Sequence, residues 1–166
     1  AVSNCTMYAI LTNRSSCLQQ FIGGVVGVHS AASFTAPMIS TGNITVTGTC
    51  DLTNAATQIG GITAAHANPI TNAQYYGNIK AIGYPCVGMI TGKLYAEGVE
   101  AKDCAIGGTI CKETREETDA AENIEIIEVV ETIDALNVRK FIYGQAVEES
   151  IATANNVTVL TWAPSS

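Results

Sequence analysis

Residues 103–113 read DCAIGGTICKE, and the fold that we predict depends on the two glycines at the centre of this stretch. A Gly-Gly pair between β-prone residues is typical of a two-residue hairpin turn, because glycine adopts the positive φ that such turns need. With Gly107 and Gly108 in the turn, Cys104 faces Cys111 on the opposite strand. Facing Cα atoms of antiparallel strands lie roughly 4.5 to 5.5 Å apart, which a disulfide can span. The stretch therefore predicts a Cys104–Cys111 disulfide across a hairpin, with a bond from either thiol to a neighbouring molecule as the alternative.

Two more segments repeat the pattern of isoleucine, two glycines and a β-branched residue. They contain Gly23-Gly24 and Gly60-Gly61, and the three glycine pairs are spaced 37 and 47 residues apart. Because these spacings are unequal, we interpret the pairs as separate hairpin turns and not as a repeat architecture. Residues 43–50 and 156–162 alternate threonine with apolar residues, as strands do. The prediction is a single mainly β domain over 1–166, an antiparallel, hairpin-rich sheet or sandwich.

One segment departs from this strand pattern. Residues 112–137 open with helix-forming residues, and glutamates then recur at every third position from Glu122 to Glu131 among isoleucines and valines. On a helical wheel most of the aliphatic residues fall opposite the glutamates, so we predict one amphipathic helix around 113–136. The β-branched content favours a strand instead, and that alternative stays open. The glutamates are expected to form a solvated face.

The charged residues are distributed very unevenly along the chain. Residues 1–79 contain only Arg14 and Asp51, whereas 80–166 contain the other 21 of the 23 charged residues. Soluble surfaces normally carry mixed charge, so the charge-poor half is expected to be wrapped by the charged half, coated by glycans, or buried against other subunits. A neutral surface rich in Thr, Asn and Ser on a monomer is the alternative. Neutral surfaces also invite pairing of strand edges. We therefore expect association with copies of the same chain.

Cysteines and glycosylation sequons favour an oxidising compartment. The six cysteines have no C-x-x-C pair, so disulfides are a better interpretation than a zinc or redox site. An Ala at position 1 is consistent with cleavage of a signal peptide. The candidate disulfide residues are Cys5, Cys17, Cys50, Cys86, Cys104 and Cys111, and the candidate glycosylation sites are Asn4, Asn13, Asn43 and Asn156. An extracellular or cell-surface location is the prediction.

Several functional classes are disfavoured by composition. A net charge of −7 does not suit nucleic acid, and no apolar run is long enough to span a membrane as a helix. The sequence indicates no metal site, no cofactor motif and no catalytic motif. The two histidines, His29 and His66, are predicted to be structural, although a small secreted hydrolase built on one of them is the least favoured alternative.

These observations lead to one functional hypothesis and one main rival. The hypothesis is a secreted structural protein, not an enzyme, that assembles with copies of itself into a sheath, surface layer or filament. Strand pairing and disulfides would stabilise the assembly. The rival is a monomeric secreted β-domain that binds a ligand or receptor.

Overall fold

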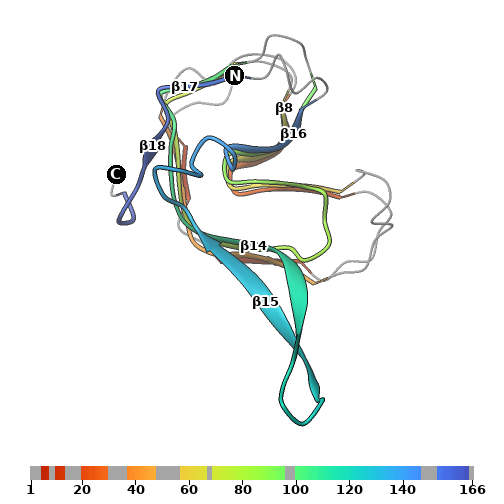
Figure 1. The fold of residues 1–166 in the computed structure, drawn as a ribbon. Coiled ribbons are helices and arrows are strands. Elements are labelled where there is room, and N and C mark those ends of the chain that lie inside the picture. Colours follow the sequence, from red (N-terminus) through yellow and green to blue (C-terminus); the bar gives the residue numbers. More distant parts are fainter. Residues whose placement is uncertain are drawn as a thin grey trace.

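The computed structural model describes residues 5–7, 10–13, 20–29, 37–47, 57–66, 69–95, 100–146 and 153–164. Within these ranges the regular structure consists of strands, with no helix. The chain winds through successive coils, and each coil places its strands beside the equivalent strands of the coil before it. Figure 1 shows the strands of successive coils overlapping one behind another. The architecture is therefore a parallel β-solenoid.

The described strands form four coils that follow a partial one. The partial coil contains β1 (Cys5–Met7) and β2 (Leu11–Asn13). The first coil contains β3 (Phe21–Gly23), β4 (Val26–His29), β5 (Met38–Thr41) and β6 (Ile44–Val46). The second contains β7 (Gln58–Gly60), β8 (Thr63–His66), β9 (Ile70–Thr71) and β10 (Ala73–Lys80). The third contains β11 (Cys86–Gly88), β12 (Thr91–Leu94), β13 (Glu100–Lys102) and β14 (Ala105–Thr118), followed by β15 (Ile124–Thr132). The fourth contains β16 (Tyr143–Ala146), β17 (Thr153–Asn155) and β18 (Thr158–Val159).

The strands pair in parallel, which corrects the predicted antiparallel, hairpin-rich sheet or sandwich. In the four-stranded sheet Val26 lies beside Thr63 and Thr63 beside Thr91, in register from coil to coil. Among the described residues only β14 and β15 pair antiparallel. Alternation of polar and apolar residues marks a strand but not the direction of its neighbour, so the sequence pattern could not separate these two architectures.

The glycine pairs do not form hairpin turns. Gly23-Gly24 and Gly60-Gly61 lie at corners, where the chain passes from the three-stranded sheet to the four-stranded one. A Cβ on Gly60 would stand 2.0 Å from the carbonyl oxygen of Thr63, so glycine is needed there for close approach of the backbone. Gly107-Gly108 lies inside the continuous strand β14, where Gly107 pairs with Tyr76 of β10. None of the three pairs is the tip of a hairpin.

Aliphatic residues stack at the same corner of all four coils. In the first two coils this corner directly follows the glycine pair. The amide of Val25 donates to the carbonyl of Ile62, that of Ile62 to Ile90, and that of Ile90 to Ile142, at 2.9 to 3.0 Å. Ile62, Ile90 and Ile142 are fully buried. This ladder joins all four coils, and β-branched side chains suit it because they pack well on a pleated surface.

The parallel register offers a second explanation for the charge-poor half of the chain. In parallel coils a side chain stacks on its equivalent in the next coil, about 4.8 Å away. Like charges at that spacing repel, whereas threonine, asparagine and glycine tolerate it. Residues 1–79 supply the first two coils and their neutral composition fits this stacking. Burial against other subunits is therefore one explanation of the neutral half and stacking within the chain is another.

The predicted helix around 113–136 is replaced by two strands. The outer part of β14 and β15 pair antiparallel, with Thr118 beside Ile124 and Glu113 beside Val129. The β-branched residues of 124–132 favour this outcome. The helix prediction rested on the three-residue spacing of the glutamates, which would place them on one side of a helix. In the strand Glu125 and Glu131 lie on one face and Glu128 on the other.

Candidate functional site

The β14–β15 hairpin projects from the solenoid, as Figure 1 shows below the coils. We call residues 112–134 the arm. A register shift between Cys111 and Glu113 marks the point where β14 leaves its coil. At the tip, Oδ1 of Asp119 accepts hydrogen bonds from the amides of Ala121 and Asn123, at 2.9 Å each. These bonds to the ionised form lower the pKa of Asp119, so the turn is well held at neutral pH.

The arm carries the whole net charge of the protein. It contains nine of the 15 acidic residues but only two of the eight basic residues, which makes −7 in all. The rest of the chain has six residues of each sign. The body is therefore formally neutral, and the negative electrostatic potential of the molecule is concentrated on the arm.

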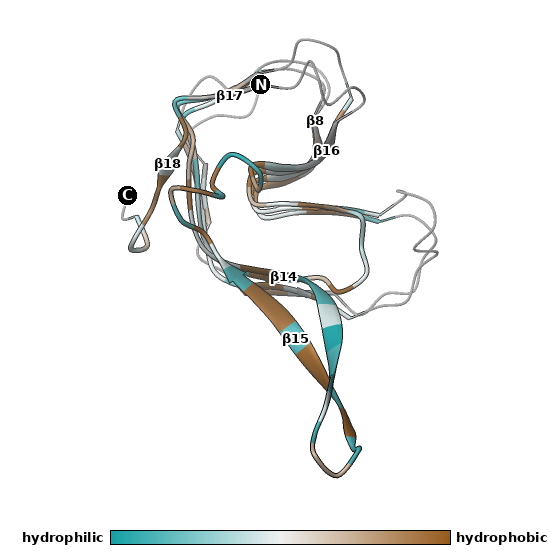
Figure 2. Ribbon diagram, viewed as in Figure 1, coloured by the Kyte–Doolittle hydropathy of each residue, from teal (hydrophilic) through white to brown (hydrophobic). Residues whose placement is uncertain are grey.

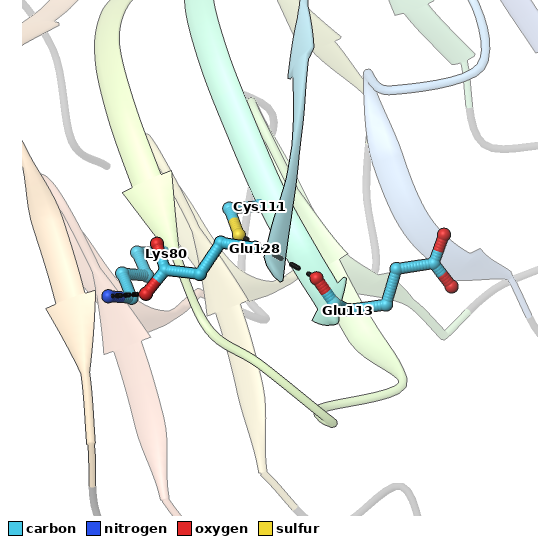
Figure 3. A network of polar contacts seen from close by, with 4 residues as sticks. All are labelled: Lys80, Cys111, Glu113 and Glu128. Atoms are coloured by element: carbon cyan, nitrogen blue, oxygen red, sulfur yellow. Dashed lines mark hydrogen bonds and ion pairs between the residues drawn. The ribbon is translucent and has the colours of Figure 1, made fainter. Parts of the chain in front are cut away.

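A small polar network ties the base of the arm to the body (Figure 3). Lys80 of β10 donates to Glu128 of β15, and this hydrogen bond raises the pKa of Lys80. The Sγ of Cys111 lies 3.9 Å from the carbonyl oxygen of Glu113. Lys80 and Glu128 are both about half exposed, so the pair contributes little to stability and mainly orients β15.

Apolar side chains on β15 face solvent. Figure 2 shows β15 as a ribbon with long hydrophobic stretches, in contrast to the hydrophilic outer part of β14. Ile124, Ile126 and Val130 are 65%, 61% and 55% exposed. They share one face of the strand with Glu128, because side chains alternate along a strand. A stripe of this kind on a projecting element is typical of an interaction site.

A shallow cleft of about 180 Å³ lies where the arm meets the body. Lys112, Glu113, Val129, Glu131, Lys140 and Phe141 line it. Burial lowers the pKa of Lys112, and the charge of Lys140 lowers it further. The cleft is shallow and four of its six lining residues are charged, so it does not resemble the mostly apolar pockets that hold small molecules.

The predicted Cys104–Cys111 disulfide is wrong for this structure. Cys104 directly precedes β14 and Cys111 lies within it, so the two residues follow one continuous strand instead of facing each other. Seven residues of extended strand separate them by roughly 23 Å. Both are buried thiols, as is Cys86. Cys5 lies on β1, and Cys17 and Cys50 are outside the described residues.

Alkylation should distinguish buried thiols at Cys104 and Cys111 from a disulfide between them. Cys104 is only 1% exposed, and burial raises its pKa to about 11, so little reactive thiolate is present at pH 8. We expect iodoacetamide to modify Cys104 and Cys111 rapidly in urea and at least about 100-fold more slowly in native protein. Peptide mapping by mass spectrometry measures both rates. A Cys104–Cys111 crosslinked peptide in a non-reduced digest would contradict the structure.

The two histidines are brought together by the coils. His29 of β4 lies beside His66 of β8 in the parallel register, and His66 lies beside Leu94 of β12. The sequence did not indicate this neighbourhood, because the residues are 37 positions apart. Ser30, the neighbour of His29 in sequence, lies outside the described residues. The ladder therefore places the backbones of the two histidines side by side in successive coils.

Two of the four glycosylation candidates can be placed with their side chains. Asn43 is exposed, and its Oδ1 accepts a hydrogen bond from the amide of Asn78 at 3.0 Å. The Nδ2 of Asn156, the atom that would carry a glycan, donates to Asp103. Asn13 lies at the end of β2, and Asn4 is outside the described residues. Glycosylation of these sites stays a prediction.

The described residues contain neither a candidate metal centre nor a candidate membrane-spanning helix. No group of three or more His, Cys, Asp and Glu side chains there is arranged to hold a metal ion. None of the described segments forms a helix of the length and hydrophobicity needed to cross a membrane. Comparison with known protein families, with curated proteins and with solved structures finds no match to this chain. The candidate functional features of the described residues are the arm and the strand edges of the coils.

Proposed function

We propose that this chain is an extracellular structural protein that assembles with copies of itself by continuing its coil stack from one molecule to the next. The observation that carries the proposal is the position of the fourth coil. Among the described strands, β16 and β17 are each at the edge of a sheet, and β18 lies beside β14 alone. At the opposite end of the four-stranded sheet, β4 is the edge strand.

Head-to-tail stacking would match these edges. All strands of the four-stranded sheet run in parallel, so β16 of one copy beside β4 of the next extends the sheet in the same direction. A contact between two different surfaces repeats from copy to copy, and it builds a filament when its rotation does not close a ring. The occupant of the fourth-coil edge in this proposal is therefore a second copy of the chain.

Charge supports such a contact. Strands β4, β16, β17 and β18 contain no Lys, Arg, Asp or Glu, and these are the residues with which soluble proteins commonly protect exposed edges. The body of the molecule is formally neutral, so copies can approach without long-range repulsion provided that the acidic arms point away from the contact. Disulfides through Cys104 or Cys111 have no part in this mechanism, because both sulfurs are buried.

The edge of β16 offers a specific test. The amide of Thr91 donates to the carbonyl of Ile142, so alternation in a parallel ladder directs the amide of Gln145 away from β12 and toward the open edge. Gln145→Pro removes that outward donor without breaking the β12 ladder. We expect it to abolish assembly or raise the concentration needed for assembly at least about tenfold. Sedimentation velocity and electron microscopy provide the measurement.

Gln145→Ala is the matched control, since it keeps the amide and should assemble like the wild type. Circular dichroism should show that both variants keep the β-rich fold. A single 17.3 kDa species at high concentration for the unaltered chain, with no ordered polymer, would reject the proposal and favour a monomeric domain that binds a ligand or receptor.

A further inference from the structure

Among the described strands, β15 also has an open outer edge, and this edge differs from the coil edges in length, charge and position. It is the last strand of the eight-stranded sheet, nine residues long, and it belongs to an element that projects from the body. Its glutamates, Glu125, Glu128 and Glu131, recur at every third position among isoleucines and valines. Charged residues of one sign on a strand edge disfavour its pairing with a copy of itself.

The charge around β15 favours some binding partners of this edge and disfavours others. Glu125, Glu128 and Glu131 lie along β15, and Glu116 and Glu117 lie on the adjoining part of β14. Lys80 and Arg115 are the only basic side chains paired with arm carboxylates among the described residues. A second copy of the arm would bring a further net charge of −7 against this one. A cationic occupant would be attracted.

We propose that β15 accepts, as an added strand, an extended basic segment of another protein in which Lys or Arg alternates with apolar residues. The backbone of the segment would hydrogen-bond to the free edge of β15, as in other cases of strand addition. Its apolar side chains would cover Ile124, Ile126 and Val130 on one face of β15, and its cationic side chains would meet Glu125 and Glu131 on the other. Charge complementarity selects this partner over a second copy of the arm.

The surface is separate from the one proposed for assembly. Binding at β15 uses the arm, whereas stacking of coils uses β16, β17 and β18 at the end of the body. Each can operate without the other. Where both operate, a filament would display one acidic arm per subunit.

A designed peptide tests the inference. The probe is a nine-residue peptide of alternating Lys and Val, acetylated and amidated at its ends. Isothermal titration calorimetry should detect binding to the full chain at low salt and a marked loss of affinity at 0.5 M NaCl. A peptide with Glu in place of Lys should not bind. The Lys-Val peptide with N-methyl groups on alternate amides keeps its charge but cannot complete a ladder, and we expect it to bind at least about tenfold more weakly.

Matched variants locate the site on the edge strand. Glu125→Lys changes a charge on β15, and Glu116→Lys makes the same change on the inner strand β14. We expect Glu125→Lys to weaken binding about tenfold or more and Glu116→Lys clearly less, because only β15 touches the added strand. Ile126→Thr, which keeps β propensity, should also weaken binding.

Three outcomes would overturn the proposal. They are equal binding of the N-methylated peptide, equal effects of the two charge reversals, and association of arms in the absence of peptide. Gln145→Pro should leave peptide binding unchanged. Failure of assembly and failure of strand addition are therefore read from different experiments.

Discussion

Replacement of Gly61 by alanine is expected to destabilise the protein by about 3–5 kcal/mol, enough to unfold much of it at 37 °C. A Cβ at this position would lie 2.1 Å from the carbonyl oxygen of Met89 and 2.4 Å from Cγ of Tyr75. The first atom belongs to the backbone of the next coil. The second belongs to a ring that is fully buried and held by a 2.8 Å hydrogen bond from its hydroxyl to the carbonyl of Gly42. Neither can move without opening the stack.

Gly27→Ala is the control for this substitution. A Cβ on Gly27 would meet its nearest atom, the carbonyl oxygen of Phe21, at 3.4 Å, which is ordinary contact. We expect a change within about 0.5 kcal/mol, because alanine also reduces the freedom of the unfolded chain. Urea unfolding followed by circular dichroism gives both free energies. Equal stability of the two variants would show that the second and third coils do not pack as closely as described.

Ile90→Ala is expected to cost about 2–5 kcal/mol, the range for removing a large buried aliphatic side chain. Ile90 is the middle step of the ladder from Ile62 to Ile142, and its backbone amide and carbonyl join the coils on both sides. It is fully buried. The cavity left by the truncation is enclosed by stacked coils, which limits its collapse.

Two further variants calibrate this loss. Ile90→Val should cost about 0.5–1.5 kcal/mol, since it removes a single methyl group from the same position. Ile124→Ala truncates an isoleucine that is 65% exposed near the tip of the arm and should change stability by less than about 0.5 kcal/mol. If Ile90→Ala and Ile124→Ala unfold at the same urea concentration, the ladder is not the core of the solenoid.

Some local structure could be predicted from the sequence. The threonine alternation of 43–50 is realised in part by β6, and that of 156–162 by β18. The acidic character of the segment after Cys111 was also evident, although its strand conformation was not. These features depend on neighbours in sequence, where residue types and short periods carry information.

The coil repeat was hidden by unequal spacing. Thr63 and its partner Thr91 are 28 residues apart, whereas Thr91 and Tyr143 are 52 apart. The arm is inserted into the longer interval, and it also produced the false helix prediction. The signal that could have revealed the repeat is the recurrence of an aliphatic residue followed by glycine at Ile22, Ile59 and Val87, which lie beside one another in register.

A β-rich chain with a neutral first half and one strongly acidic segment could be predicted from the sequence, because these properties depend only on amino-acid composition along the chain. The tertiary structure alone decided that the strands run parallel in stacked coils, that glycine pairs serve close packing of backbones, and that Cys104 and Cys111 lie apart on one strand. Each of these depends on which distant segment becomes the neighbour. Which strands become neighbours depends on the packing of whole coils against one another, and no local sequence pattern specifies this pairing.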